Sequence, residues 1–158
     1  SLLLALDTLN KVSYKNVFII FGDVLFRKHI LEILMESPED IVIAVDPMSQ
    51  NVSDAERDLV KCSRRYNPLQ FESVKLLEIS SKLQDYDGER IGIIKLTKRG
   101  IEMLKGVIKT LGVDSSIIEI LNELAREGNV HVSYTPGYWV DLDSLEDIIK
   151  AGSMYGSN

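Results

Sequence analysis

Five consecutive apolar residues, Val17 to Phe21, run without a break into Gly22 and Asp23. An apolar run without polar alternation is typical of a strand buried on both faces, as in a parallel α/β sheet. Such sheets bind ligands at their carboxyl edge, where Gly22 would let a ligand approach the backbone and Asp23 would offer a carboxylate. Asp23 is therefore the first candidate for a functional residue. The alternative is that it caps a helix beginning at Val24.

Alternating strands and helices are indicated after Asp23. Residues 25–36 place apolar side chains at helical spacing, and a second apolar run, 41–45, follows them. Strand, helix and strand in succession are typical of right-handed crossovers in a parallel sheet. Further segments expected are strands at 58–63, 73–79, 91–96 and 130–134, helices at 2–11, 98–111 and 145–151, and one helix capped by Asp114 or Ser115 and closed by Gly128. We therefore predict a three-layer α/β/α sandwich with a mostly parallel, Rossmann-like sheet.

Length and composition exclude several classes of protein. The 158 residues suit one domain over 1–158. Eighteen basic and twenty-four acidic residues give a net charge of -6 with no basic stripe, which argues against a nucleic-acid partner. The single cysteine, Cys62, cannot form an internal disulfide, and no apolar run is long enough to span a membrane. We expect a cytoplasmic protein that has no membrane partner.

A second candidate segment, GYWVDLDSLED, covers Gly137 to Asp147. Asp141 and Asp143 alternate with apolar residues, so both carboxylates would point to one side of an extended segment. Paired carboxylate oxygens suit a hard divalent cation such as Mg²⁺. If this segment meets Asp23 in space, the three aspartates would hold one metal between them. The alternative is a solvated strand end, with one aspartate helping to cap a helix.

Together, FIIFGDVLF and GYWVDLDSLED resemble the nucleotidyltransferase superfamily that makes sugar nucleotides and CDP- or CMP-activated compounds. In that family a Gly-Asp pair after a central strand supplies one magnesium ligand, which matches Asp23. The late motif supplies another, which matches Asp143, with Asp141 beside it. The segment GERIGIIK is similar to the strand that lines the family's acceptor pocket. The resemblance therefore implies Mg²⁺ as cofactor and substrate contacts at Glu89 and Lys95.

The order of two further segments narrows the resemblance. Residues 58–63 followed by residues 89–95 are most similar to the nucleotidyltransferase domains attached to phosphoenolpyruvate phosphomutases, which belong to phosphonate biosynthesis. This similarity implies magnesium-dependent transfer of CMP from CTP to a phosphonate or phosphate acceptor, with release of pyrophosphate. We expect the protein to contribute metal placement, charge neutralisation and alignment rather than covalent catalysis.

One departure from the family concerns phosphate binding. The family begins with a strand and a glycine-rich loop whose backbone donors cradle phosphates, whereas the first glycine here is Gly22. We therefore expect the chain to be the C-terminal part of a nucleotidyltransferase domain, a fragment of a longer chain with little or no activity alone.

Two other functions stay open. A metal-dependent glycosyltransferase would use the Asp-x-Asp at Asp141 and Asp143, although that motif normally falls in the middle of the domain. A non-catalytic, truncated interaction domain would self-associate as a homodimer through an exposed strand edge.

The remaining candidates have plainer explanations. Gly22 and Trp139 could contact substrate, the second by stacking on it, although aromatic residues beside a strand more often fill the core. We expect packed or solvated positions for His29 and His131, and a buried, inert thiol for Cys62. The pair Arg64 and Arg65 is expected to form an exposed charged turn.

Overall fold

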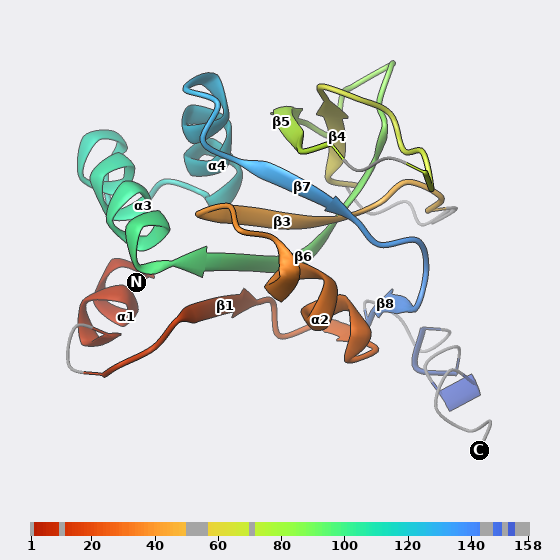
Figure 1. The fold of residues 1–158 in the computed structure, drawn as a ribbon, viewed down its shortest axis with the longest axis horizontal. Coiled ribbons are helices and arrows are strands. Elements are labelled where there is room, and N and C mark those ends of the chain that lie inside the picture. Colours follow the sequence, from red (N-terminus) through yellow and green to blue (C-terminus); the bar gives the residue numbers. More distant parts are fainter. Residues whose placement is uncertain are drawn as a thin grey trace.

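The computed structural model describes residues 2–9, 12–49, 57–69, 72–142, 147–149 and 152–153 (Figure 1). The helices are α1 (Leu2–Thr8), α2 (His29–Glu36), α3 (Lys98–Leu111) and α4 (Ile117–Arg126). The strands are β1 (Asn16–Ile20), β2 (Val24–Phe26), β3 (Ile41–Asp46), β4 (Leu59–Cys62), β5 (Val74–Ile79), β6 (Gly88–Thr97), β7 (His131–Tyr134) and β8 (Trp139–Asp141). Among these described helices, none has the length and apolar character needed to cross a bilayer.

Six strands form one mixed sheet in the order β1-β6-β3-β7-β5-β4, and β4 also pairs with β6. Within the described strands, β3 and β7 form the one parallel pair of this sheet, and every other neighbouring pair is antiparallel. The prediction of a mostly parallel sheet is therefore wrong. An apolar run indicates that both faces of a strand are buried. A central strand is buried on both faces whether its neighbours are parallel or antiparallel to it, so the run does not indicate their direction.

The direction of three strands nevertheless places the candidate site as expected. Strand β6 is antiparallel to both β1 and β3, and β3 is parallel to β7, so β1, β3 and β7 all run the same way. Their carboxyl ends therefore meet at one edge of the sheet. Asp23 follows the end of β1 and Asp46 ends β3, which brings both carboxylates to this edge.

Strand β1 differs from the prediction in its burial. It pairs with β6 alone among the described strands, and its residues are half-buried or exposed. The prediction that Val17 to Phe21 form a strand buried on both faces is therefore wrong. Strand β3 has that property instead, since all its residues are buried. Its apolar residues alternate between two clusters, one holding Ile43 and the other holding Ala44.

Helices pack against both clusters. The larger cluster takes buried side chains from α1, α3 and α4, and the smaller takes Ile30 and Leu34 from α2 together with Trp139. Helix α3 begins after Thr97, whose hydroxyl accepts a hydrogen bond from the Gly100 amide, as predicted. Helix α4 is capped by Ser116 rather than by Asp114 or Ser115. The chain is thus a mixed α/β domain.

Candidate functional site

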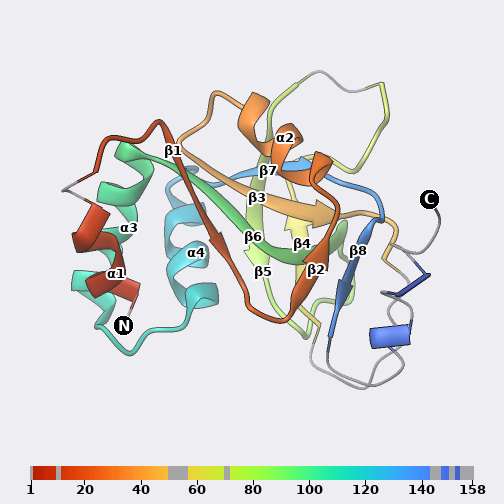
Figure 2. The same cartoon turned by 90° about the horizontal axis from the view of Figure 1, so that it is seen from below.

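Strands β2 and β8 form a two-stranded antiparallel ribbon apart from the main sheet, here called the β2/β8 ribbon (Figure 2). Its register places Val24 opposite Asp141 and Phe26 opposite Trp139. The Leu142 amide extends the pairing by donating to the Asp23 carbonyl oxygen at 2.8 Å. Two motifs far apart in the sequence therefore converge, as a shared metal site would require.

Asp23 is exposed where β1 gives way to β2, and its neighbour Gly22 is also exposed. The alternative in which Asp23 caps a helix is wrong, because Val24 begins strand β2 and the N-cap position of α2 is Lys28. A Cβ atom on Gly22 would meet no atom within 4 Å. The space over Gly22 is therefore open to a ligand.

The late carboxylates are described in part. Asp141 is partly exposed at the end of β8, in the extended conformation that its alternation with apolar residues predicts. Asp143 lies outside the described residues. Among the residues that the structure does describe, no three His, Cys, Asp or Glu side chains are grouped so that they could hold a metal. The metal ligands Asp23, Asp141 and Asp143 therefore remain a prediction.

Asp46, which the sequence analysis passed over, joins the sheet to the ribbon. Its Oδ2 accepts from the Trp139 Nε1–H at 2.8 Å and from the Gly137 amide at 3.2 Å. Its Oδ1 accepts from the Met48 amide at 2.9 Å. The available signal was a similar pattern in two places, an unbroken apolar run followed by an aspartate, which comes directly after the run at Asp46 and after Gly22 at Asp23.

Trp139 is 8% exposed and belongs to the smaller core cluster, as the plainer explanation of this residue predicts, and its contact with a substrate stays a prediction. The neighbouring Tyr138 is exposed and has a φ of 63°, a left-handed conformation that is unusual for a bulky residue. The Arg27 guanidinium lies 5.6 Å from the centre of its ring, and the His29 ring meets it edge-on at 5.1 Å.

Glu89 lies opposite Asp46 in the pairing of β6 with β3, and is therefore at the same edge of the sheet. It is 5% exposed. Its Oε2 accepts from Arg57 Nη2 at 2.9 Å and Nε at 3.1 Å, and also from the Ser49 hydroxyl. The Arg57 guanidinium in turn lies over the ring of Tyr86. The predicted substrate contact at Glu89 is thus a buried carboxylate already held by an arginine.

Lys95 is buried and bonded to the backbone, and its contact with substrate stays a prediction. It is 1% exposed, and its Nζ donates to the backbone carbonyl oxygens of Ser37 and Glu39 at the end of α2. Burial lowers the pKa of this amine, and the nearby Asp40 carboxylate opposes that effect. The register places Lys95 opposite Phe18, the middle residue of β1.

The lesser candidates largely behave as expected. Cys62 is buried, and burial raises the pKa of its thiol to about 11, so it is unreactive at neutral pH. His131 is half-buried beside Glu39. Arg64 and Arg65 are exposed and form ion pairs with carboxylates, Arg64 with Glu72.

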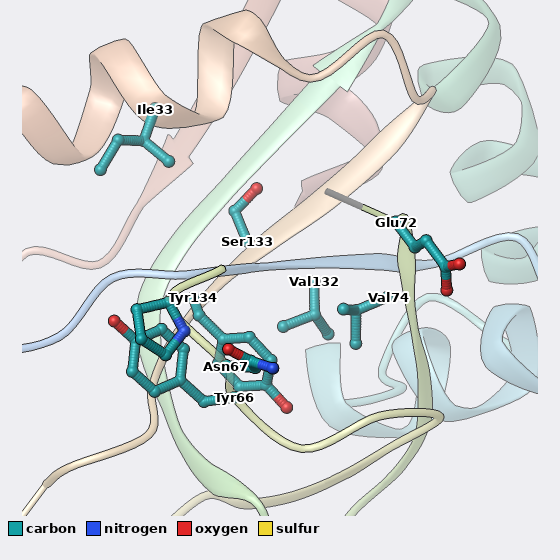
Figure 3. Close-up of a pocket in the computed structure, with 9 residues that line it drawn as sticks. Ile33, Tyr66, Asn67, Glu72, Val74, Val132, Ser133 and Tyr134 are labelled. Atoms are coloured by element: carbon teal, nitrogen blue, oxygen red, sulfur yellow. The ribbon is translucent and has the colours of Figure 1, made fainter. Parts of the chain in front are cut away.

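A cavity of 330 Å³ lies elsewhere, between β7 and the connection from β4 to β5 (Figure 3). Tyr66, Glu72 and Tyr134 contribute polar atoms to its lining, and Ile33 of α2 stands at one end of it. The two tyrosine rings meet edge-on, with centres 5.5 Å apart. None of the residues predicted for the metal or the substrate lines this cavity.

Comparison with known proteins identifies the fold. No protein-family model and no curated protein matches this chain. Solved structures that it resembles include the inositol-1-phosphate CTP transferase from T. maritima, with a TM-score of 0.72 and 16% identity over 98% of this chain. Another is a Bacillus anthracis protein assigned as a glucose-1-phosphate thymidylyltransferase, in complex with a sucrose, with a TM-score of 0.67 and 19% identity over 99% of this chain. A third is a UTP-bound UGPase from Acinetobacter baumannii, with a TM-score of 0.66 and 16% identity over 98% of this chain. The chain spans 61%, 60% and 54% of these proteins and has the fold of nucleotidyltransferases.

Proposed function

We propose that this chain is part of a magnesium-dependent nucleotidyltransferase, which transfers CMP from CTP to a phosphonate or phosphate acceptor and releases pyrophosphate. The observation that carries the proposal is the β2/β8 ribbon, which places Asp23 beside the strand that ends at Asp141. The ribbon adjoins the edge where β1, β3 and β7 end, and such edges are where α/β sheets bind ligands.

The proposed chemistry needs carboxylates and open backbone rather than a nucleophilic side chain. An acceptor oxygen attacks the α-phosphorus of CTP, a new P–O bond forms, and the bond to the β-phosphate oxygen breaks as pyrophosphate leaves. Magnesium, when bound, neutralises the charge that develops on the phosphates. Asp23 and Asp143 would hold it, with Asp141 as alternative or supporting ligand. Gly22 leaves room for a phosphate to approach the backbone.

The finer specificity rests on two supports. Residues 58–63 followed by residues 89–95 are most similar to nucleotidyltransferase domains attached to phosphoenolpyruvate phosphomutases, which belong to phosphonate biosynthesis. One of the similar structures is a CTP transferase whose acceptor is an inositol phosphate, as its name states. Glu89, at the same edge as Asp46, would contact the acceptor through the network that it forms with Arg57 and Ser49.

The chain spans about three fifths of the length of the first two similar structures, so the test measures ligand binding rather than catalytic activity. We expect calorimetry to detect CTP binding that requires magnesium, and Asp23→Asn to weaken it by about two orders of magnitude through loss of a metal ligand. Because Asp23 is exposed, the Asp23→Asn protein should have the melting temperature of the wild type. Asp114→Asn removes an equally exposed carboxylate in the turn before α4 and should bind as the wild type does.

Two results would contradict the proposal. Equal binding by Asp23→Asn and the wild type would remove Asp23 from the metal site. A folded wild-type chain that binds no triphosphate and sediments as a dimer would support a non-catalytic, self-associating domain, using the side of β1 that β6 does not cover.

A further inference from the structure

We propose that Asp46 is a positioning residue that holds the β2/β8 ribbon, and with it Asp23 and Asp141, against the carboxyl end of the main sheet. The expectation that Asp46 affects metal binding rests on the proposed function. The claim that Asp46 holds the ribbon rests on its hydrogen bonds and does not need the proposed function.

Asp46 is 4% exposed, so its carboxylate has exchanged water for hydrogen bonds within the protein. The two ends of the carboxylate bind different segments. Oδ1 holds the turn that follows β3 through the Met48 amide, while Oδ2 accepts from Gly137 and Trp139 as the chain enters β8. Hydrogen bonds to a buried charged group are among the stronger ones in proteins.

These contacts connect directly to the candidate site. Trp139, which donates to Asp46, is the first residue of β8, and Asp141 is the last. The next amide, that of Leu142, donates to the Asp23 carbonyl oxygen. Among the described strands, β2 and β8 pair with each other and with none of the main sheet. Backbone hydrogen bonds at the two connections into the ribbon, one to β6 and one to β3, and side-chain packing also hold it in place. Asp46 adds the side-chain hydrogen bonds at the entrance to β8.

The backbone of the turn before β8 is consistent with a segment held in place from outside. Gly137 and Tyr138 are both left-handed, with φ values of 67° and 63°. A bulky residue in this region is strained and keeps its conformation where the surrounding contacts impose it. The bonds of Asp46 to the residues on either side of Tyr138 are contacts of this kind.

Asp46→Asn tests the proposal with little change in volume. All three partners of Asp46 are N–H donors, so an amide group in its place would set its own N–H₂ against at least one of them.

A matched control is Asp87→Asn. Asp87 is also a buried carboxylate that accepts from a backbone amide, that of Cys62 at 2.8 Å, and its ion pairs are with Lys61 and Arg65 rather than with the ribbon.

Hydrogen exchange followed by NMR gives a direct readout. Trp139 is the only tryptophan, so the protein has a single indole N–H signal. In Asp46→Asn we expect this proton and the Leu142 amide to exchange at least about tenfold faster, because the ribbon opens without global unfolding. The Ile94 amide in β6 should exchange at the wild-type rate, and Asp87→Asn should leave the ribbon unchanged.

The proposal is overturned if the Leu142 amide of Asp46→Asn exchanges at the wild-type rate, or accelerates only in step with Ile94. If Asp46→Asn does not fold, Trp139→Phe removes one donor and keeps an apolar ring. Unchanged exchange at Leu142 in that variant would overturn the proposal equally. Where the wild type binds magnesium and CTP, Asp46→Asn should bind them at least about tenfold more weakly. A wild type that binds neither contradicts the proposed function, while the exchange rates still decide the role of Asp46.

Discussion

The central strand β6 and the β2/β8 ribbon both bring carboxylates to one edge of the sheet, but they treat those charges in opposite ways. Glu89 on β6 is buried and held by Arg57, whereas Asp23 at the start of the ribbon is exposed. A buried carboxylate needs a partner because it has lost its hydrating water, and the partner then takes up the hydrogen-bonding capacity of its oxygen atoms. An exposed carboxylate at a strand end keeps the oxygen atoms that a cation would bind. Burial therefore separates the carboxylate that is bound within a side-chain network, Glu89, from the carboxylate that is open to a cation, Asp23.

Removing the partner of Glu89 should give the largest effect. Arg57→Met leaves the Glu89 carboxylate buried without its arginine, so we expect the free energy of unfolding to fall by about 3–5 kcal/mol. Urea denaturation measures this change. Arg126→Met, which breaks the exposed pair with Glu123, should cost less than about 1 kcal/mol. If Arg57→Met also lost less than about 1 kcal/mol, the buried Glu89 would not depend on Arg57. The double variant Arg57→Met/Glu89→Gln would then be no more stable than Arg57→Met.

Two glycines sharpen the contrast between a packed and an open position. A Cβ on Gly100 would overlap the backbone carbonyl oxygen of Asp40, so Gly100→Ala should lower the stability by about 1–3 kcal/mol. Gly22→Ala meets no neighbour and should change it by less than about 0.5 kcal/mol. Thermal melting of both variants checks this order. A large loss at Gly22 would show that the ribbon entrance is packed rather than open.

His131 on β7 should show a smaller effect, which depends on pH. Burial lowers the pKa of its imidazole below the ordinary 6.5, and the Glu39 carboxylate only partly opposes this. The unfolded chain therefore binds the proton first as the pH falls, and stability present above pH 6.5 is lost below it. Urea denaturation at pH 7.5 and 5.5 should show a steeper loss for the wild type than for His131→Gln. Equal slopes would show that burial does not perturb His131.

Several parts of the fold could be predicted because they depend on neighbours in the sequence. The apolar run at 41–45 predicted β3, and the helical pattern over 98–111 predicted α3. The same local signals failed where distant residues decide. The helix predicted over 25–36 forms as α2 only from His29 onward, because Val24–Phe26 pair with Trp139–Asp141 as strand β2.

Side-chain roles were harder to predict than strands. Lys95 and Trp139 resemble ligand-binding residues by type, yet both are buried and bonded inside the protein. Their residue types are compatible with either position, and the local sequence does not indicate how deeply they are buried. The role of Asp46 was missed because two of its three hydrogen-bond partners, Gly137 and Trp139, are distant in the sequence.

The sequence by itself determined where most strands and helices lie and which two motifs carry the candidate metal ligands, because apolar spacing, caps and short motifs are local properties of the chain. Only the tertiary structure decided that β6 runs against its neighbours, that the two motifs meet in the β2/β8 ribbon, and that Asp46 joins this ribbon to the sheet. These features consist of hydrogen bonds and packing between residues distant in the chain. Local propensity contains no information about such partners, since they come together only when the chain has folded.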